Sequence, residues 1–110
     1  MSQVFHAHLD HAAFEPFALG TVQWLRRPGE NGNEVLSGGI WKVSPEEAPE
    51  PFDLPIDQDE TIYIVSGHLR IEVKGGSVLE LTEGSMASLS KGAMTRWTVL
   101  EPTLEFFVYS

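Results

Sequence analysis

The sequence predicts an all-β domain, either a sandwich or a barrel. Its second half consists of short segments of β-branched, aromatic and aliphatic residues, separated by glycine-containing turns about every ten residues. In one segment apolar Leu69, Ile71 and Val73 alternate with polar residues, so this strand has a buried face and His68 points to solvent. Because 110 residues, 42% of them hydrophobic, suffice for one core, we expect residues 1–110 to form a single domain.

The first part of the chain predicts an arm followed by a hairpin. Residues 1–19 are assigned to an N-terminal arm and residues 20–109 to the β-structure that follows. Within the arm, residues 10–17 are compatible with one helical turn or with an edge strand, and Pro16 argues against a longer helix. Two strands then follow, at 21–26 and 35–43, joined by a loop of turn-forming residues.

Residues 44–60 are predicted to form an extended acidic loop. The segment holds four of the seven prolines and seven acidic residues, and it holds no Lys or Arg. The simplest interpretation is a solvated connection that proline makes stiff, since charge runs usually serve solvation. The alternative is an acidic lip that binds a partner or collects cations.

Beyond the acidic loop the pattern predicts an antiparallel meander. Each expected strand is a run of apolar or alternating residues, and each expected turn contains glycine or proline. The strands are expected at 61–65, 69–74, 78–81, 85–89, 95–100 and 104–109, with turns at 66–67, 75–76, 83–84, 90–92 and 101–102.

Composition argues against several classes of partner. Sixteen acidic against seven basic residues give a formal charge of -9, which repels nucleic acid and anionic membranes, so neither is expected as a partner. The chain has no cysteine, and its first twenty residues lack the apolar core of a secretion signal. These features favour a cytoplasmic protein.

Two segments resemble the paired motifs of the cupin superfamily. Glu60 is followed after six residues by Gly67, and the segment 84–92 begins and ends with glycine, about one hairpin later. Further residues resemble a subfamily of small cupins that includes the ureidoglycine aminohydrolase-type and ethanolamine-utilisation-type domains. These residues are Gly39-Ile40-Trp41, Pro45, Asp59 and Arg96-Trp97. The resemblance implies a double-stranded β-helix, the RmlC-like jelly-roll barrel, with an internal pocket and frequently a homodimer.

The same resemblance argues against a metal at this site. The histidine positions of the family's first motif fall on Leu54 and Ile56, or on Asp53 and Pro55 in its longer variant, and the position in the second motif falls on Thr95. Glu60 is thus the one family ligand that is retained, and we expect no metal and no cofactor because one carboxylate does not hold a metal. The clustered histidines of the arm, His6, His8 and His11, are a minor alternative metal site.

The candidate site is therefore an apolar pocket around a single acid. If Glu60 points inward, strand alternation brings aromatic and aliphatic side chains to the same interior. Burial would raise the pKa of Glu60, which makes it the candidate catalytic residue for proton transfer, or a group that binds an amine. Alternatively Glu60 accepts structural hydrogen bonds, and the tryptophans are core residues whose N–H groups could still orient a ligand. The expected ligand-binding residues are Trp41, Ile56, Ile62, Thr95 and Trp97.

Three functions follow from this site. The first is a small-molecule-binding cupin without a metal, possessing Glu60 as its key polar group. The second is a non-catalytic structural or regulatory homodimer whose barrel is filled with side chains. The third function, a minor alternative, is a metal-dependent cupin enzyme.

Overall fold

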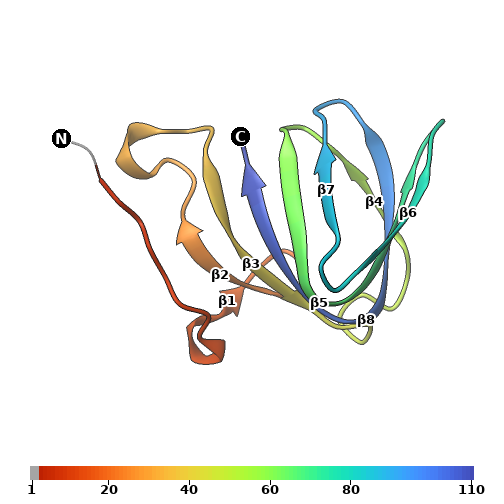
Figure 1. The fold of residues 1–110 in the computed structure, drawn as a ribbon, viewed down its shortest axis with the longest axis horizontal. Coiled ribbons are helices and arrows are strands. Elements are labelled where there is room, and N and C mark those ends of the chain that lie inside the picture. The colour runs from red at the N-terminus through yellow and green to blue at the C-terminus, as the bar shows by residue number, and fades with distance from the viewer. Residues whose placement is uncertain (1–2) are drawn as a thin grey trace.

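The computed structural model describes residues 3–110, and it confirms the all-β fold (Figure 1). Apart from two short 3-10 helices, η1 (His11–Ala13) and η2 (Glu30–Gly32), the regular structure of the described residues is β-strand. The strands are β1 (Glu15–Pro16), β2 (Thr21–Arg26), β3 (Ser37–Val43), β4 (Phe52–Pro55), β5 (Glu60–Val73), β6 (Val78–Thr82), β7 (Met86–Leu89) and β8 (Met94–Tyr109). No helix in the described part is long and apolar enough to cross a membrane.

Two long strands, β5 and β8, run side by side through the whole barrel. Their pairing extends from Glu60 opposite Tyr109 to Val73 opposite Thr95. The first half of β5 also pairs with β7, and its second half pairs with β6. The C-terminal half of β8 pairs with β3, and its N-terminal half pairs with β4. The strands of the described residues form one eight-stranded sheet, which curves into the jelly-roll barrel in Figure 1.

The predicted meander is wrong, because two of its turns lie inside continuous strands. Residues 66–67 and 101–102 are irregular positions of β5 and β8, where the register between the two strands shifts. Gly67 has a φ of 108°, and a Cβ there would lie 2.5 Å from the carbonyl oxygen of Pro102 and against Thr103 Oγ1. The backbone N–H of His68 donates to Thr103 Oγ1 at 3.1 Å. Glycine thus permits a bulge with a close approach of two backbones, where the sequence predicted a chain reversal.

The acidic segment 44–60 is not entirely a loop, contrary to the prediction. Strand β4 lies within it and pairs with the start of β8, with Phe52 opposite Trp97 and Pro55 opposite Met94. Proline is compatible with this strand because β4 pairs on one side with β8, and its other edge needs no donor. The strand places two hydrophobic residues that lie among acidic ones in the sequence, Phe52 and Leu54, beside β8 in the barrel.

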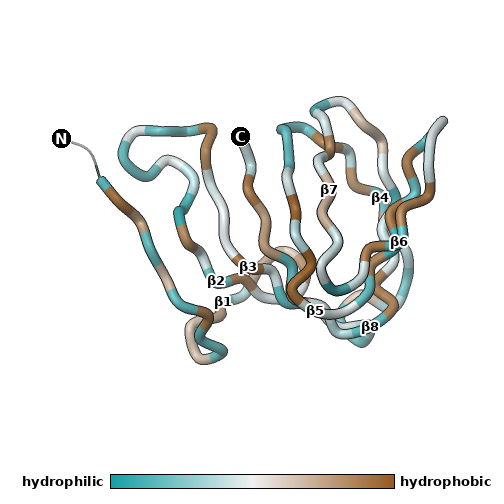
Figure 2. The backbone as a smooth tube through the Cα atoms, viewed as in Figure 1, coloured by the Kyte–Doolittle hydropathy of each residue, from teal (hydrophilic) through white to brown (hydrophobic). Residues whose placement is uncertain are grey.

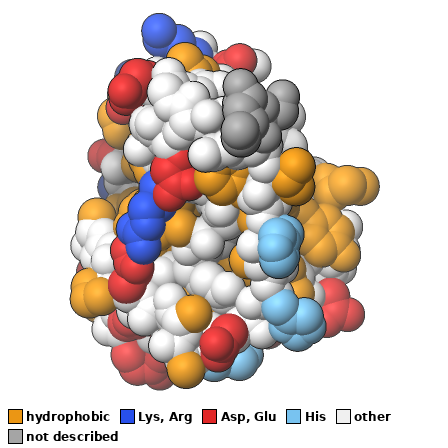
Figure 3. Space-filling view, turned by 90° about the vertical axis from the view of Figure 1, so that its left-hand side faces the viewer, with side chains coloured by type: hydrophobic (Ala, Val, Ile, Leu, Met, Phe, Trp, Pro, Cys, Tyr) orange, Lys and Arg blue, Asp and Glu red, His pale blue; other side chains and the backbone are white. Residues whose placement is uncertain are grey.

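The N-terminal arm contains both of the structures that its sequence allowed. Asp10 caps η1 by accepting from the N–H of Ala12 at 2.9 Å, and β1 pairs with β2. Gln23 of β2 holds the arm, because its side chain donates to the carbonyl of His8 at 2.8 Å and accepts from the N–H of Asp10 at 2.9 Å. On this side of the molecule hydrophobic, acidic, basic and histidine side chains are interspersed (Figure 3). The hairpin of β2 and β3 is confirmed.

The core lies inside the curved sheet, and the inner faces of β5 and β8 contribute much of it. The strands carry most of the hydrophobic segments and the β2–β3 loop is hydrophilic (Figure 2). Leu69 and Ile71 are fully buried, as their alternation predicts. On the outer face, His68 Nε2 lies 2.8 Å from Glu80 Oε1, and Glu80 also pairs with Arg70 at 2.7 Å. The alternation of β5 therefore correctly assigned the two faces of this strand.

Candidate functional site

Glu60 is the first residue of β5 and points into the barrel. Over the first five residues of this strand, Glu60, Ile62 and Ile64 are buried, whereas Thr61 and Tyr63 are exposed. Glu60 itself is 4% exposed. The period of two along a strand therefore places a carboxylate among core side chains, as predicted.

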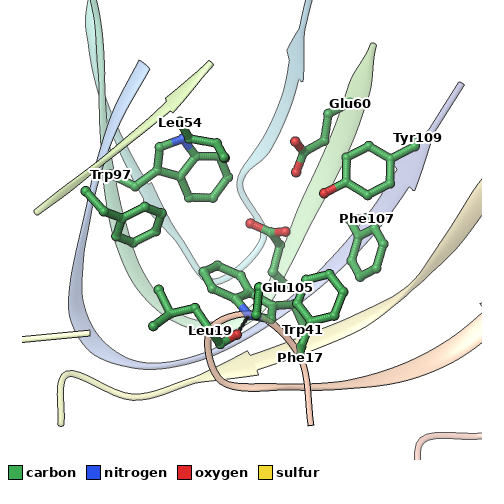
Figure 4. A pocket seen from close by; sticks show the side chains of 11 residues that line it. Phe17, Leu19, Trp41, Leu54, Glu60, Trp97, Glu105, Phe107 and Tyr109 are labelled. Atoms are coloured by element: carbon green, nitrogen blue, oxygen red, sulfur yellow. Dashed lines mark hydrogen bonds between the residues drawn. The ribbon is translucent and has the colours of Figure 1, made fainter. Parts of the chain in front are cut away.

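A cavity of about 140 Å³ opens beside this carboxylate. Its wall is built of side chains from the arm, β3, β4, β5 and β8, and it is mainly aromatic and aliphatic (Figure 4). The lining residues are Phe17, Ala18, Leu19, Trp41, Phe52, Leu54, Glu60, Trp97, Glu105, Phe107 and Tyr109. The barrel interior is thus not completely filled at the end where Glu60 lies.

The cavity holds a second carboxylate, Glu105, which the sequence interpretation missed. Glu105 lies on β8 opposite Trp41 of β3 and Ile64 of β5, and it is 2% exposed. Its Oε2 is buried and has no hydrogen-bond partner in the described part of the chain. Figure 4 shows the carboxylates of Glu60 and Glu105 and the hydroxyl of Tyr109 directed into the same space. The prediction of a single acid in the pocket is therefore wrong.

Burial, and to a smaller extent neighbouring negative charges, raises the pKa values of the two acids and of the tyrosine. Burial, and secondarily the negative charge of Asp57, raises the pKa of Glu60 to about 7. Burial, and then the charge of Glu60, raises the pKa of Glu105 well above its ordinary value. The pKa of Tyr109 is raised by burial and by the charges of Glu60, Glu105 and Asp57. Lys, Arg and His are absent from the residues that line the cavity, so no positive side chain in its wall compensates these acids.

The two tryptophans present ring surfaces to the cavity and use their N–H groups elsewhere. Trp41 and Trp97 lie edge to face, with centroids 6.0 Å apart. Trp41 Nε1 donates to the carbonyl of Leu19 at 2.7 Å, and Trp97 Nε1 donates to Thr95 Oγ1 at 2.8 Å. The idea that these N–H groups orient a ligand is therefore wrong, because both are already satisfied.

Three other predicted ligand-binding residues lie outside this cavity wall. Thr95 is buried and donates to the carbonyl of Leu54 at 2.6 Å, so its hydroxyl joins β4 to β8 and supports Trp97. Ile62 is 1% exposed in the core. Ile56 lines an adjoining outer hollow of about 360 Å³, which shares Glu60 with the cavity. Of the predicted residues, Glu60, Trp41 and Trp97 thus come together at one place.

The site does not fit the metal centre that the cupin motifs would imply. Leu54 and Thr95, at two of the family's histidine positions, are engaged with each other through the bond just described. Across residues 3–110 no three His, Cys, Asp or Glu side chains gather closely enough to hold a metal ion. In the arm, His8 Nδ1 bonds to the carbonyl of Leu9 at 2.9 Å, and His11 stacks on Phe14 with centroids 5.8 Å apart. His6, His8 and His11 therefore make no common site.

Comparison with known proteins gives a family match and several similar folds. The sequence model of the EutQ-like cupin domain matches residues 30–105. No curated protein sequence matches the chain. The EutQ protein of Clostridium difficile has a TM-score of 0.65 and 20% identity over 81% of this chain, which spans 60% of the solved chain. An ethanolamine utilization protein Q from Salmonella typhimurium has a TM-score of 0.70 and 14% identity, covering 99% of this chain and 95% of its own. A DUF861 family protein from Thermotoga maritima has a TM-score of 0.55 and 29% identity, covering 62% of this chain and 73% of its own.

Proposed function

The chain belongs to the family of EutQ-like cupin domains, as its motifs predicted, and from that premise we propose that it binds a small molecule in the cavity beside Glu60 without a metal ion. The observation that carries the proposal is an open, mainly aromatic cavity with a buried carboxylate in its wall. Small-molecule sites are typically concave, apolar and provided with a few convergent polar groups.

The cavity favours this proposal over a barrel that is merely filled core. Core carboxylates in structural roles are normally hydrogen-bonded, because an unpaired buried charge costs several kcal/mol. Here Glu105 Oε2 is buried and has no hydrogen-bond partner within residues 3–110. A buried carboxyl oxygen without a structural partner, in the same cavity wall as Glu60, is better explained as a group that meets a ligand.

Glu60 is also the candidate catalytic residue of the proposal. A carboxyl group with a pKa of about 7 exchanges its proton near neutral pH, which suits a general acid or base. The apolar walls would keep bulk water from competing for that proton. An isomerase, lyase or hydrolase reaction on the bound molecule is compatible with such a group.

Three compact probes of different charge test binding: 1-butanol, butyrate and n-butylammonium. At least one is expected to change the emission of Trp41 and Trp97, which form part of the wall. Glu60→Gln should weaken that response, whereas the matched control Glu101→Gln, an exposed acid on β8, should leave it unchanged. If none of the probes alters the fluorescence or the melting temperature of the wild-type protein, the proposal is wrong.

The metal-free state and the homodimer are tested separately. Stoichiometric iron, manganese, nickel or zinc in protein purified without an affinity tag would overturn the metal-free proposal. For the dimer, Tyr63 and Met86 are neighbours across β5 and β7 and are 42% and 76% exposed, a pair of apolar side chains on the outer face. Light scattering should give a dimer mass for the wild type and a monomer mass for the Tyr63→Ser, Met86→Ser variant.

A further inference from the structure

We propose that the cavity selects a small organic ammonium ion, whose charged group lies between the carboxylates of Glu60 and Glu105 and whose apolar body lies against Trp41 and Trp97. This inference rests on the proposed binding function and names the chemical class of its ligand. It is carried by an unsatisfied carboxylate oxygen, by the composition of the walls and by the acidic outer hollow.

Glu105 provides the first step. Its side chain is almost completely buried, it faces the cavity, and its Oε2 has no partner among the described residues. Protonation would remove the charge of this group but would give its second oxygen no donor. An ammonium ion supplies both a positive charge and several N–H donors at one point, which is what a pair of buried carboxylates requires.

The protein itself offers no cation to these acids. Lys, Arg and His are absent from the residues that line the cavity, and also from those that line the outer hollow. The four ion pairs of the described residues all lie elsewhere and involve Glu15, Asp53 and Glu80. A cation that pairs with Glu60 and Glu105 would therefore come from outside the chain.

The walls suit a cation with an apolar body. Trp41 and Trp97 have satisfied N–H groups, so they offer the negative faces and the edges of their rings, and Phe107 and Tyr109 add two more aromatic rings. Cations bind over aromatic faces, and such aromatic cages recognise ammonium groups in other proteins. The cavity of about 140 Å³ is similar in size to apolar protein cavities of about 150 Å³ that bind benzene, which limits the ligand to a compact molecule.

The outer hollow next to the cavity also favours a cation. The outer hollow shares Phe17, Leu54, Glu60 and Tyr109 with the cavity, and Glu34 and Asp57 also line it. With a formal charge of -9 on the chain, this acidic entrance attracts cations and repels anions.

The test compares n-butylammonium with its neutral isostere 1-butanol and with butyrate, by isothermal titration calorimetry on the wild-type protein. We expect n-butylammonium to bind at least tenfold more tightly than either of the others at pH 7.5. Glu105→Gln and Glu60→Gln should each weaken n-butylammonium binding roughly 10- to 100-fold, as expected for a lost charged hydrogen bond, without weakening 1-butanol. The control Glu101→Gln removes one charge outside the cavity and should change neither.

Proton release gives an independent readout. Asp57 lines the outer hollow and not the cavity. The acidic groups that line the cavity itself are Glu60 of β5 and Glu105 and Tyr109 of β8. A bound cation favours their ionised forms, so n-butylammonium should release protons, which calorimetry in two buffers of different ionisation enthalpy detects. The neutral 1-butanol should release none.

Each outcome decides between the two proposals. Binding of 1-butanol or butyrate without preference for n-butylammonium would keep the small-molecule function and overturn the ammonium inference. Equal n-butylammonium affinity in wild type and Glu105→Gln would also overturn the inference, because the second carboxylate would then have no role in recognition. Absence of binding by all three probes would overturn both. Circular dichroism of each variant confirms that a loss of binding occurs in a folded protein.

Discussion

Removing the ionisable group of Glu60 should change how the stability of the ligand-free protein depends on pH. The pKa of Glu60 is raised from 4.5 to about 7 in the folded protein, so folding favours its protonated form. Below pH 4.5 the group is protonated in both states and has no effect. As the pH rises from 4.5 toward 7, the unfolded chain loses this proton before the folded one does, and the free energy of unfolding falls.

The size of the effect follows from the pKa difference. Between pH 4.5 and 7, each unit of pH lowers the contribution of Glu60 to the free energy of unfolding by about 1.4 kcal/mol. The wild-type protein should therefore lose about 3 kcal/mol of stability from this group by pH 8. Glu60→Gln keeps the shape of the side chain and cannot ionise. The variant should therefore equal the wild type near pH 4.5 and be more stable at pH 8. Glu105 adds to the difference, since its raised pKa depends in part on the charge of Glu60.

Urea unfolding followed by tryptophan fluorescence, at pH values from 4.5 to 8, measures this difference. Ion pairs lower the pKa values of other carboxyl groups, such as Glu15 and Glu80, and these groups make the free energy of unfolding rise with pH. They are present in both proteins, so their contributions cancel in the difference between the wild type and the variant. Glu101→Gln serves as the exposed control and should run parallel to the wild type. Parallel curves for wild type and Glu60→Gln would refute the reasoning, because Glu60 would then titrate as a solvated acid.

Two further predictions concern positions that support the site. Thr95→Val should destabilise the protein by about 2–4 kcal/mol, because the carbonyl of Leu54 and the N–H of Trp97 would both lose a hydrogen-bond partner. Thr95→Ser keeps the hydroxyl and should retain most of the wild-type stability, as measured by urea unfolding. Gly67→Ala should lower the stability more than Gly75→Ala. Both glycines have positive φ, but a Cβ at position 67 would meet the opposite strand, whereas a Cβ at position 75 would meet nothing within 4 Å. Equal melting temperatures for the two alanine variants would contradict the close approach at the bulge.

The sequence predicted the faces of strands better than their connections. Where polar and apolar residues alternate, as from His68 to Val73, the buried side follows from the period of two. Glycine is less informative, because it occurs both in chain reversals and in bulges. Gly67 lies in a bulge because Thr103, from a distant part of the chain, packs closely against it. The residues next to Gly67 in the sequence do not predict this long-range contact.

The candidate site was predicted in part for the same reason. Glu60 was identified by its spacing to Gly67 in a recognisable motif. Glu105 was missed because residues 104–109 are hydrophobic on both parities, so alternation does not tell which face is inward. Thr95 shares the inward parity of Trp97, but parity gives only the direction of a side chain. Whether that side chain reaches the cavity or bonds to the next strand depends on β4, which was not recognised as a strand.

The pairing of β5 with β8 also has a consequence for how the chain acquires its fold. These two strands are separated in sequence by β6 and β7, yet they form the most extensive pairing in the molecule, from Glu60 opposite Tyr109 to Val73 opposite Thr95. The intervening segment must be closed into a loop before this pairing contributes any stability, which is a slow step in β proteins. The carboxylates of Glu60 and Glu105 come from these same two strands. The cavity beside Glu60 is therefore completed only when β5 and β8 pair, and a truncated chain that lacks β8 would lose both the pairing and this part of the cavity wall.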